Sequence, residues 1–291
     1  MTDEPLAPGL YLVSTPIGNL EDITLRALRV LRSVDRIACE DTRQTRKLLD
    51  RYTIATPTLS SHEHNEAARS RQLIEELRAG ARIAVVSDAG TPGISDPGMV
   101  LAAAAVAAGI AVYPVPGPSA LLAGLVASGL NTDNFLFVGF LPSKAGARRT
   151  ALENLAASIP PTTTIVFYEA PHRIAETLAE IENLWGADCR IVLARELTKI
   201  HEEFLRGSVG DVRSQVVGRD SLRGEIVLLV EAPPADAIRP LPSANLLSRL
   251  DELEKSENLS AKDALKRIAR ERGISKSELW RELQRERARG K

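Results

Sequence analysis

The strongest constraint on the fold is a regular alternation of short apolar segments with helical patterns between residues 10 and 117. Stretches of amphipathic sequence at 20–31 and 66–77 have helical length. Strands joined through helices in this way pair in parallel. We therefore predict an α/β domain with a largely parallel sheet over residues 1–117. Its expected strands are 10–13, 36–39, 56–61, 83–86 and 111–113.

A second group of apolar segments follows a short small-residue helix at 120–127. These segments predict a second α/β domain over residues 118–232, with a domain boundary near Gly117. Four prolines between 233 and 242 indicate a linker. The remaining residues, 243–291, have a helical pattern. The expected strands of the second domain are 135–140, 164–168, 191–194 and 225–230.

Charge and composition limit the possible functions. The net charge of -1 is uneven, because residues 246–291 hold 13 Lys and Arg against 9 Asp and Glu. Aromatic residues make up only 4% of the chain, so stacking on many aromatic side chains is not expected. Cys39 and Cys189 lack metal-ligand spacing, and no signal peptide or long apolar span is seen. We expect a cytoplasmic protein with reduced thiols and no membrane segment.

The run SDAGTPGISDPG, residues 87–98, lies between an apolar strand and an alanine-rich helix, where open α/β sheets bind ligands. Its glycines permit close approach of backbone, and its only charges are Asp88 and Asp96. This polarity favours a ligand with hydroxyls or positive charge over one with phosphates. Asp96 is expected to cap a helix that has Pro97 in its first turn and ends at Gly109. A stiff connector is the alternative.

Several common site motifs are absent. The first strand is followed by STPIGNL at 14–20, which is not a glycine-rich dinucleotide fingerprint, and no phosphate-binding P-loop occurs. Ser119 follows Pro118 and lacks the second glycine of a nucleophile elbow, which argues against a serine hydrolase. His62 and His64 share one face of an extended segment, but no further ligands follow at suitable spacing. No metal site is expected.

Polar side chains cluster directly after several strands. Glu40 and Asp41 end the second strand, where they could bind ligand hydroxyls or act as a base. They could equally cap the next helix and pair with Arg43 or Arg46. Two further clusters, at 167–173 and 195–203, follow strands of the second domain and indicate a binding region.

Two basic regions are candidates for nucleic acid. Lys144, Arg148 and Arg149 form a patch suited to phosphates, or a solvated first turn of a helix. In the tail, residues 262–280 fit a helix-turn-helix in which Ala269 is inside, Gly273 makes the turn, Ser275 caps and Leu279 anchors the second helix. Packing or protein contacts are the alternative role. The tail cations are Lys266, Arg267, Arg270, Lys276, Arg281 and Arg285.

Taken together, the ordered motifs resemble the ribosomal RNA small-subunit methyltransferase I family, a branch of the tetrapyrrole-methylase-like S-adenosylmethionine enzymes. The resemblance covers residues 10–232, and the tail is similar to the family's C-terminal helical region. Several motifs in one order make it specific. The motifs are STPIGNLEDIT at 14–24, EDTR at 40–43, SDAGTPGISDPG at 87–98, PGPSA at 116–120, FVGFLP at 137–142, FYEAPHR at 167–173 and RELTKIHEE at 195–203.

The resemblance implies two α/β domains with S-adenosylmethionine in the cleft between them, and a homodimer. It implies 2′-O-methylation of a cytidine ribose in small-subunit (16S) rRNA, within a ribosomal particle. A tetrapyrrole or other small-molecule methyltransferase, and a ligand-sensing DNA-binding regulator, are the alternatives. Candidate bases are Glu169, Lys199, Glu40 and His62. The implied cofactor contacts are Thr15, Pro16, Asp88, Ala89, Gly90, Thr91, Pro116, Ser119, Ala120, Ala170 and Leu197.

Overall fold

The chain forms two compact units. The first comprises Met1–Ala127 and Arg195–Glu203, and the second comprises Ser128–Ala194 and Phe204–Lys291. The division therefore follows Ala127, whereas the sequence placed a boundary near Gly117. The computed structural model describes residues 5–61, 66–160, 162–219, 222–232, 246, 250, 253–254, 260–271 and 275–289.

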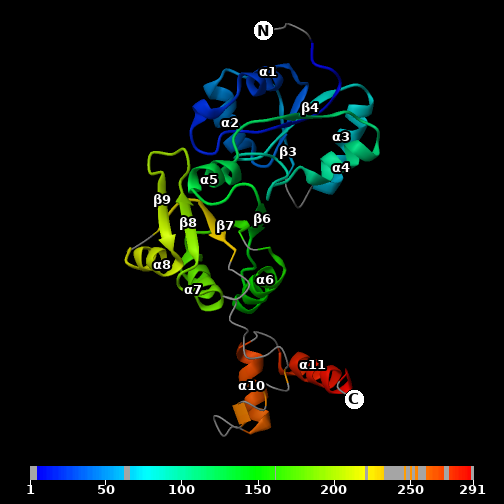
Figure 1. Ribbon diagram of the computed structural model, residues 1–291. Helices are drawn as coiled ribbons and strands as arrows, with labels where there is room; N and C mark the ends of the chain where they lie inside the picture. Colours follow the sequence, from blue (N-terminus) through cyan, green and yellow to red (C-terminus); the bar gives the residue numbers. More distant parts are fainter. Residues whose placement is uncertain are drawn as a thin grey trace. The chain divides into compact units, whose positions relative to one another are not determined.

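The first unit contains a five-stranded sheet in the order β3-β2-β4-β1-β5. Figure 1 labels β3 and β4 of this sheet. The pairings of β1 with β4 and β5, and of β2 with β3 and β4, are all parallel. The aliphatic runs thus form the parallel sheet that their alternation with helices predicted. The strands are β1 (Gly9–Val13), β2 (Arg36–Cys39), β3 (Thr58–Ser60), β4 (Arg82–Val86) and β5 (Val112–Val115).

Helices cover both faces of this sheet. Alternate residues of β1 point in opposite directions, so Tyr11 and Val13 join one core and Leu10 joins the other. The first core includes α1 (Leu25–Ser33) and α2 (Thr42–Arg51). The second includes α3 (Glu66–Arg78) and α4 (Met99–Ala107). The helix α5 (Ala120–Ser128) ends at the boundary of the unit.

The expected helix over 20–31 is wrong in its first half. Leu20–Asp22 is one 3-10 turn, after which Ile23 is extended. Thr24 then caps α1, because its hydroxyl accepts a hydrogen bond from the Ala27 amide at 3.0 Å. A threonine hydroxyl competes for backbone amides and favours a helix start over a helix interior.

The second unit contains a mixed sheet in the order β6-β7-β10-β8-β9. β7 pairs in parallel with β6 and antiparallel with β10. The four expected strands are confirmed, but β9 was not predicted. As an edge strand it is only partly buried, and its sequence EFLRGS gives no clear apolar alternation. The strands are β6 (Phe135–Phe140), β7 (Thr164–Glu169), β8 (Arg190–Arg195), β9 (Glu203–Ser208) and β10 (Ile226–Glu231).

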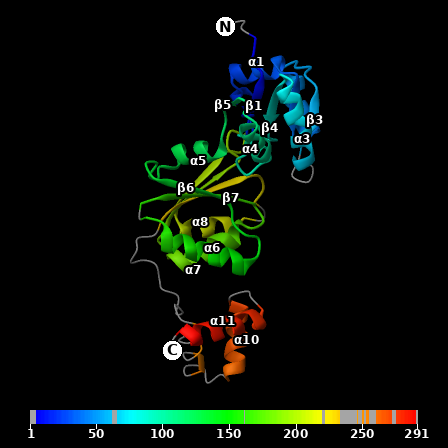
Figure 2. The same ribbon diagram turned by 90° about the vertical axis from the view of Figure 1, so that its right-hand side faces the viewer.

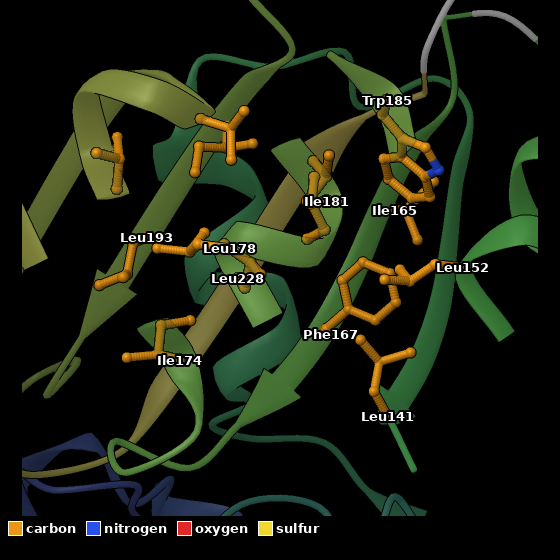
Figure 3. Packing of buried hydrophobic residues seen from close by; sticks show 14 of the residues in the cluster. Leu141, Leu152, Ile165, Phe167, Ile174, Leu178, Ile181, Trp185, Leu193 and Leu228 are labelled. Carbon is orange, nitrogen blue, oxygen red and sulfur yellow. The ribbon is translucent and has the colours of Figure 1, made fainter. Parts of the chain in front are cut away.

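Three helices pack on one face of this second sheet (Figure 2). They are α6 (Ala145–Ser158), α7 (Ile174–Trp185) and α8 (Val209–Val217). Phe167 from β7 and Leu178 from α7 are fully buried in the shared core, which Figure 3 shows from close by. The core is mostly aliphatic and also contains Trp185.

Two described helices of the tail, α10 (Ala261–Glu271) and α11 (Lys276–Arg289), share a separate core. Ala269 and Leu279 are buried in it, and Ser275 caps α11 by accepting a hydrogen bond from the Glu278 amide at 3.2 Å. These three sequence predictions are confirmed. Gly273, expected at the turn, lies outside the described residues.

Candidate functional site

The polar segments that follow β1, β2, β4 and β5 lie at one edge of the first sheet, because parallel strands end at the same edge. β1 leads into α1 on one face, whereas the neighbouring β4 leads into α4 on the other. Adjacent strands whose connections leave on opposite faces mark the point where open α/β sheets bind ligands. The sequence-predicted residues from Thr15 to Ala120 are distributed around this point.

Hydrogen bonds join the ends of β1, β4 and β5. Thr15 and Gly90 form an isolated antiparallel bridge, in which each amide donates to the other's carbonyl at 2.9 and 3.0 Å. The Ser14 and Thr91 hydroxyls are 3.1 Å apart, and the Thr91 hydroxyl also donates to the Pro118 carbonyl at 3.3 Å. Thr15, Gly90, Thr91 and the PGPSA segment are thus held together, as the binding-region prediction requires.

Gly90 is required at this bridge by its backbone conformation. Its φ of 82° lies in the left-handed region, which favours glycine. A Cβ there would lie 3.4 Å from Ile17 Cγ2, an ordinary contact, so conformation rather than space selects glycine.

Asp88 is exposed and links the end of β4 to the start of α2. Its Oδ1 accepts a hydrogen bond from the Asp41 amide at 3.1 Å. Asp41 in turn caps α2, since its carboxylate accepts from the Arg43 amide at 2.8 Å and from the Arg43 guanidinium. The hydrogen bonds from Arg43 hold the pKa of Asp41 below its usual value. Of the two roles left open for Asp41, the structure therefore shows the capping role.

The prediction that Asp96 caps α4 is wrong. The helix begins at Met99, and its N-cap position is Gly98, with φ of 124°, rather than Asp96. Pro97 consequently lies before the helix, where its carbonyl accepts a hydrogen bond from the Gly93 amide at 3.1 Å. Residues 87–98 are an irregular loop to the end, and all three of its glycines, Gly90, Gly93 and Gly98, have positive φ.

Sequence reasoning placed Leu197 and Lys199 in the second domain, but residues 195–203 belong to the first unit. The Thr198 hydroxyl accepts a hydrogen bond from the Asn19 amide at 3.0 Å. A Cβ on Gly18 would lie 2.4 Å from Lys199 Cγ, so only glycine fits beneath this segment. Leu197 is buried. The glycine in STPIGNL was the only signal for this close approach.

The 195–203 segment has an unusual backbone. Glu196 and Thr198 have φ of 53° and 66°, a conformation that non-glycine residues seldom adopt. The Lys199 ammonium lies 2.7 Å from Glu196 Oε1, which ties the side chain to its own turn. Such local strain persists only where the surroundings impose it, and it is common at binding sites.

Glu169, a candidate base, is 2% exposed and is occupied by structural contacts. Its oxygens accept hydrogen bonds from the Ala170 amide at 2.8 Å and from the Thr177 hydroxyl at 2.7 Å. Arg173 Nε lies 3.3 Å from the same carboxylate, and the Arg173 guanidinium donates to the Leu141 carbonyl at 2.7 Å. Glu169 therefore anchors α7 and the segment after β6, and this geometry does not support a role as base.

Arg148 requires a correction, because it was expected to bind RNA phosphates. The side chain is buried, with 1% of the residue exposed. Its guanidinium forms ion pairs with Glu176 at 3.0 Å and with Glu180 at 2.9 Å. Arg148 joins α6 to α7 and is not available to a phosphate.

The other candidates have varied positions. Arg149 pairs with Glu153 at 3.1 Å, and Lys144 is exposed at the start of α6. Glu40 is partly buried at the end of β2. The candidate base His62 lies outside the described residues. Pro116 is exposed, whereas Pro16 is buried. Ala89, Ser119, Ala120 and Ala170 are partly buried.

The tail presents its cations to solvent. Lys266 and Arg267 on α10, and Lys276, Arg281 and Arg285 on α11, are exposed. Arg270 belongs to α10, but its side chain lies outside the described part of the structure. Among the described residues, no three His, Cys, Asp or Glu side chains are grouped as metal ligands. None of the helices searched in those residues has the length and apolarity needed to cross a membrane.

Comparisons with known proteins add the family context. Residues 9–213 match the family model described as Tetrapyrrole (Corrin/Porphyrin) Methylases. The chain is 46% identical to "Ribosomal RNA small subunit methyltransferase I" of Mesorhizobium japonicum, over 96% of this chain and 92% of that protein. It is 43% identical to the protein of the same name from Bacillus subtilis, over 93% and 92% of the two chains.

Solved structures share the fold at lower identity. A diphthine synthase structure matches with a TM-score of 0.59 and 15% identity, covering 77% of this chain and 89% of that one. A uroporphyrin-III C-methyl transferase from Thermus thermophilus, complexed with S-adenyl homocysteine, matches with a TM-score of 0.53 and 19% identity. It covers 76% of this chain and 96% of that one. At these identities the likeness shows the fold alone.

Proposed function

Because the chain belongs to the ribosomal RNA small subunit methyltransferase I family of the tetrapyrrole (corrin/porphyrin) methylases, we propose that it is an S-adenosylmethionine-dependent rRNA methyltransferase. Its target is the 2′-hydroxyl of a cytidine ribose in small-subunit (16S) rRNA. The carrying observation is 46% identity over 96% of the chain, which includes the basic tail. We further propose a cytoplasmic homodimer that acts on the ribosomal particle.

The edge of the first sheet suits S-adenosylmethionine chemically. This cofactor carries a sulfonium, an ammonium, a carboxylate and ribose hydroxyls, but no phosphate. The loop 87–98 contains no Lys or Arg, and Asp88 offers an exposed carboxylate. Left-handed Gly93, which is only partly buried, allows a ligand to approach the backbone closely. A phosphate-bearing ligand would favour a loop with cations instead.

We assign the cofactor contacts to the hydrogen-bonded strand ends and their neighbours. Backbone amides near Gly90 can bind the carboxylate, and Asp88 can accept from a hydroxyl or the ammonium. The assignment of Ala170, which lies on the second unit, stays a prediction. The first-unit residues assigned are Thr15, Pro16, Asp88, Ala89, Gly90, Thr91, Pro116, Ser119, Ala120 and Leu197.

The chemistry requires alignment more than activation. When bound, S-adenosylmethionine supplies a methyl group that its sulfonium has already activated. The chain must then orient the ribose hydroxyl and exclude water, and such positioning contributes roughly 7 to 11 kcal/mol. No protein nucleophile is needed. A base that accepts the hydroxyl proton would add about 10² to 10⁴ in rate, and of the described candidates Glu40 and Lys199 remain on the first unit.

Methyl transfer from labelled S-adenosylmethionine tests the proposal. The purified chain is incubated with small ribosomal subunits, free rRNA, double-stranded DNA or a porphyrinoid. We expect label in the small subunit or its rRNA. Label in the porphyrinoid would show instead a small-molecule methyltransferase of the same fold. Label in none of the four would reject the enzyme activity.

Cofactor binding is tested separately by isothermal titration. Asp88→Asn keeps an acceptor for the Asp41 amide but removes the charge, so we expect weaker S-adenosylmethionine binding with an unchanged fold. Asp96→Asn, in the same loop, is the matched control and should bind as the wild type does. Equal affinity in both variants would remove Asp88 from the cofactor site.

A further inference from the structure

One aromatic side chain of the tail lies on its surface. The chain has two tryptophans, of which Trp185 is 2% exposed in the core of the second unit. Trp280, on α11, is 48% exposed. The core that α11 shares with α10 consists of leucine, isoleucine and alanine side chains. Half of a large indole thus faces solvent, while smaller side chains complete the core.

Trp280 lies on the same helix as three exposed cations. Residues four apart lie above one another on a helix, which places Lys276, Trp280 and Gln284 in one row. The adjacent row contains Arg281 and Arg285 at the same spacing. All of these side chains are exposed, whereas Leu279 and Leu283 on the inner face are buried. The tryptophan therefore sits within a basic surface.

The described acidic residues of α11 offset only part of this charge. Glu278 turns back to the helix start, where its carboxylate accepts from the Ser275 amide at 2.9 Å and the Ser275 hydroxyl at 2.8 Å. These hydrogen bonds lower the pKa of Glu278. Glu278 is thus held in a capping box as an ionised carboxylate, and Glu282 is the other described acidic side chain. Against these two carboxylates the described part of α11 carries three exposed cations, Lys276, Arg281 and Arg285, so a small positive charge remains.

We infer that the outer face of α11 binds an unpaired RNA base, which stacks on Trp280 while Lys276, Arg281 and Arg285 contact the flanking phosphates. This inference rests on the proposed function, which makes RNA the substrate. Sequence-specific recognition of RNA mostly targets unpaired nucleotides, because the deep and narrow major groove of an A-form duplex hides its base edges. Unpaired bases stack readily on aromatic rings within a basic surface.

The charge favours RNA over a protein partner. Protein interfaces bury their tryptophans among apolar neighbours, with charged residues depleted at the centre. Here the residues three and four positions from Trp280 are Lys276, Ser277, Leu283 and Gln284, of which only Leu283 is apolar. A polyanion with planar bases complements both the cations and the indole.

Fluorescence of the full-length protein tests the inference. Trp280 emission is obtained as the difference between the wild type and Trp280→Phe, so Trp185 need not be changed. A 12-nucleotide single-stranded RNA of mixed sequence and the corresponding perfect RNA duplex are the probes. We expect saturable quenching by the single strand and much less by the duplex. Equal quenching by both, or none by either, would overturn the inference.

Affinity variants separate stacking from charge. Trp280→Ala should weaken binding of the single strand roughly 5- to 150-fold without changing the salt dependence, and Trp280→Tyr should restore most of the affinity. Arg281→Gln should instead reduce the salt dependence by about one phosphate contact. Unchanged affinity of Trp280→Ala would reject the inference. If this occurs while the wild type still methylates rRNA, the proposed function stands and only this inference fails.

Discussion

The contact between Gly18 and the 195–203 segment gives the sharpest stability prediction. In Gly18→Ala, the new Cβ would lie 2.4 Å from Lys199 Cγ, 2.8 Å from Thr198 Oγ1 and 3.1 Å from the Leu197 carbonyl oxygen. Overpacking of this kind costs about 1 to 3 kcal/mol. Displacing Thr198 also breaks its hydrogen bond from the Asn19 amide, a net loss of about 0.5 to 1.5 kcal/mol.

Alanine also lowers the conformational entropy of the unfolded chain. This effect stabilises the folded protein by about 0.4 to 1 kcal/mol and offsets part of the cost. The net expectation for Gly18→Ala is a free energy of unfolding lower by about 0.5 to 4 kcal/mol. Urea unfolding followed by circular dichroism measures it, and titration with S-adenosylmethionine should show weaker binding because Leu197 moves with the segment.

Gly210→Ala is the matched control. Gly210 lies in α8, and its nearest contact for a Cβ is 3.6 Å, so alanine should fit and stabilise the helix by up to about 1 kcal/mol. If Gly18→Ala unfolds at the same urea concentration as the wild type, or matches Gly210→Ala, the segment does not pack on Gly18 as described and the reasoning is refuted.

Three further predictions concern buried and paired groups. Arg148→Met should lower the free energy of unfolding, measured by urea titration, by about 3 kcal/mol, because Glu180 loses its partner. Arg149→Met is the control and should change it by less than about 0.5 kcal/mol, because the pair of Arg149 with Glu153 is more exposed. Burial raises the pKa of Cys189 to about 12, so this thiol should react with Ellman's reagent at pH 8 far more slowly in the native protein than after unfolding. Equal rates in the two states would contradict the raised pKa. Hydrogen bonds from Arg82 lower the pKa of Asp35. The wild type should therefore have a higher free energy of unfolding than Asp35→Asn above about pH 4, and this difference should decrease as the pH falls. A difference that stays constant down to pH 2 would show that the pair contributes nothing.

The fold could be predicted wherever local pattern decides structure. The aliphatic strands of the first sheet read as a parallel sheet because each is followed by a helix of suitable length. The tail helices were likewise predicted from the caps and buried positions at Ser275 and Leu279. β9 was missed because an edge strand needs no continuous apolar sequence.

The site was predictable as a set of strand ends, but not in its long-range contacts. Arg148 looked like a surface cation, and only the fold brings it to Glu176 and Glu180, which lie 28 and 32 positions along the chain. The Asn19 amide meets Thr198 across a separation of 179 residues. Such pairings depend on topology, which no local spacing encodes.

The measurement that most directly tests the central claim is the position of the transferred methyl group. Small-subunit rRNA labelled by the purified chain is hydrolysed in alkali. Alkali cleaves a linkage only where the ribose before it has a free 2′-hydroxyl. The account predicts that the label remains in an alkali-resistant dinucleotide that begins with cytidine. Label released entirely in mononucleotides would place the methyl elsewhere and contradict ribose 2′-O-methylation.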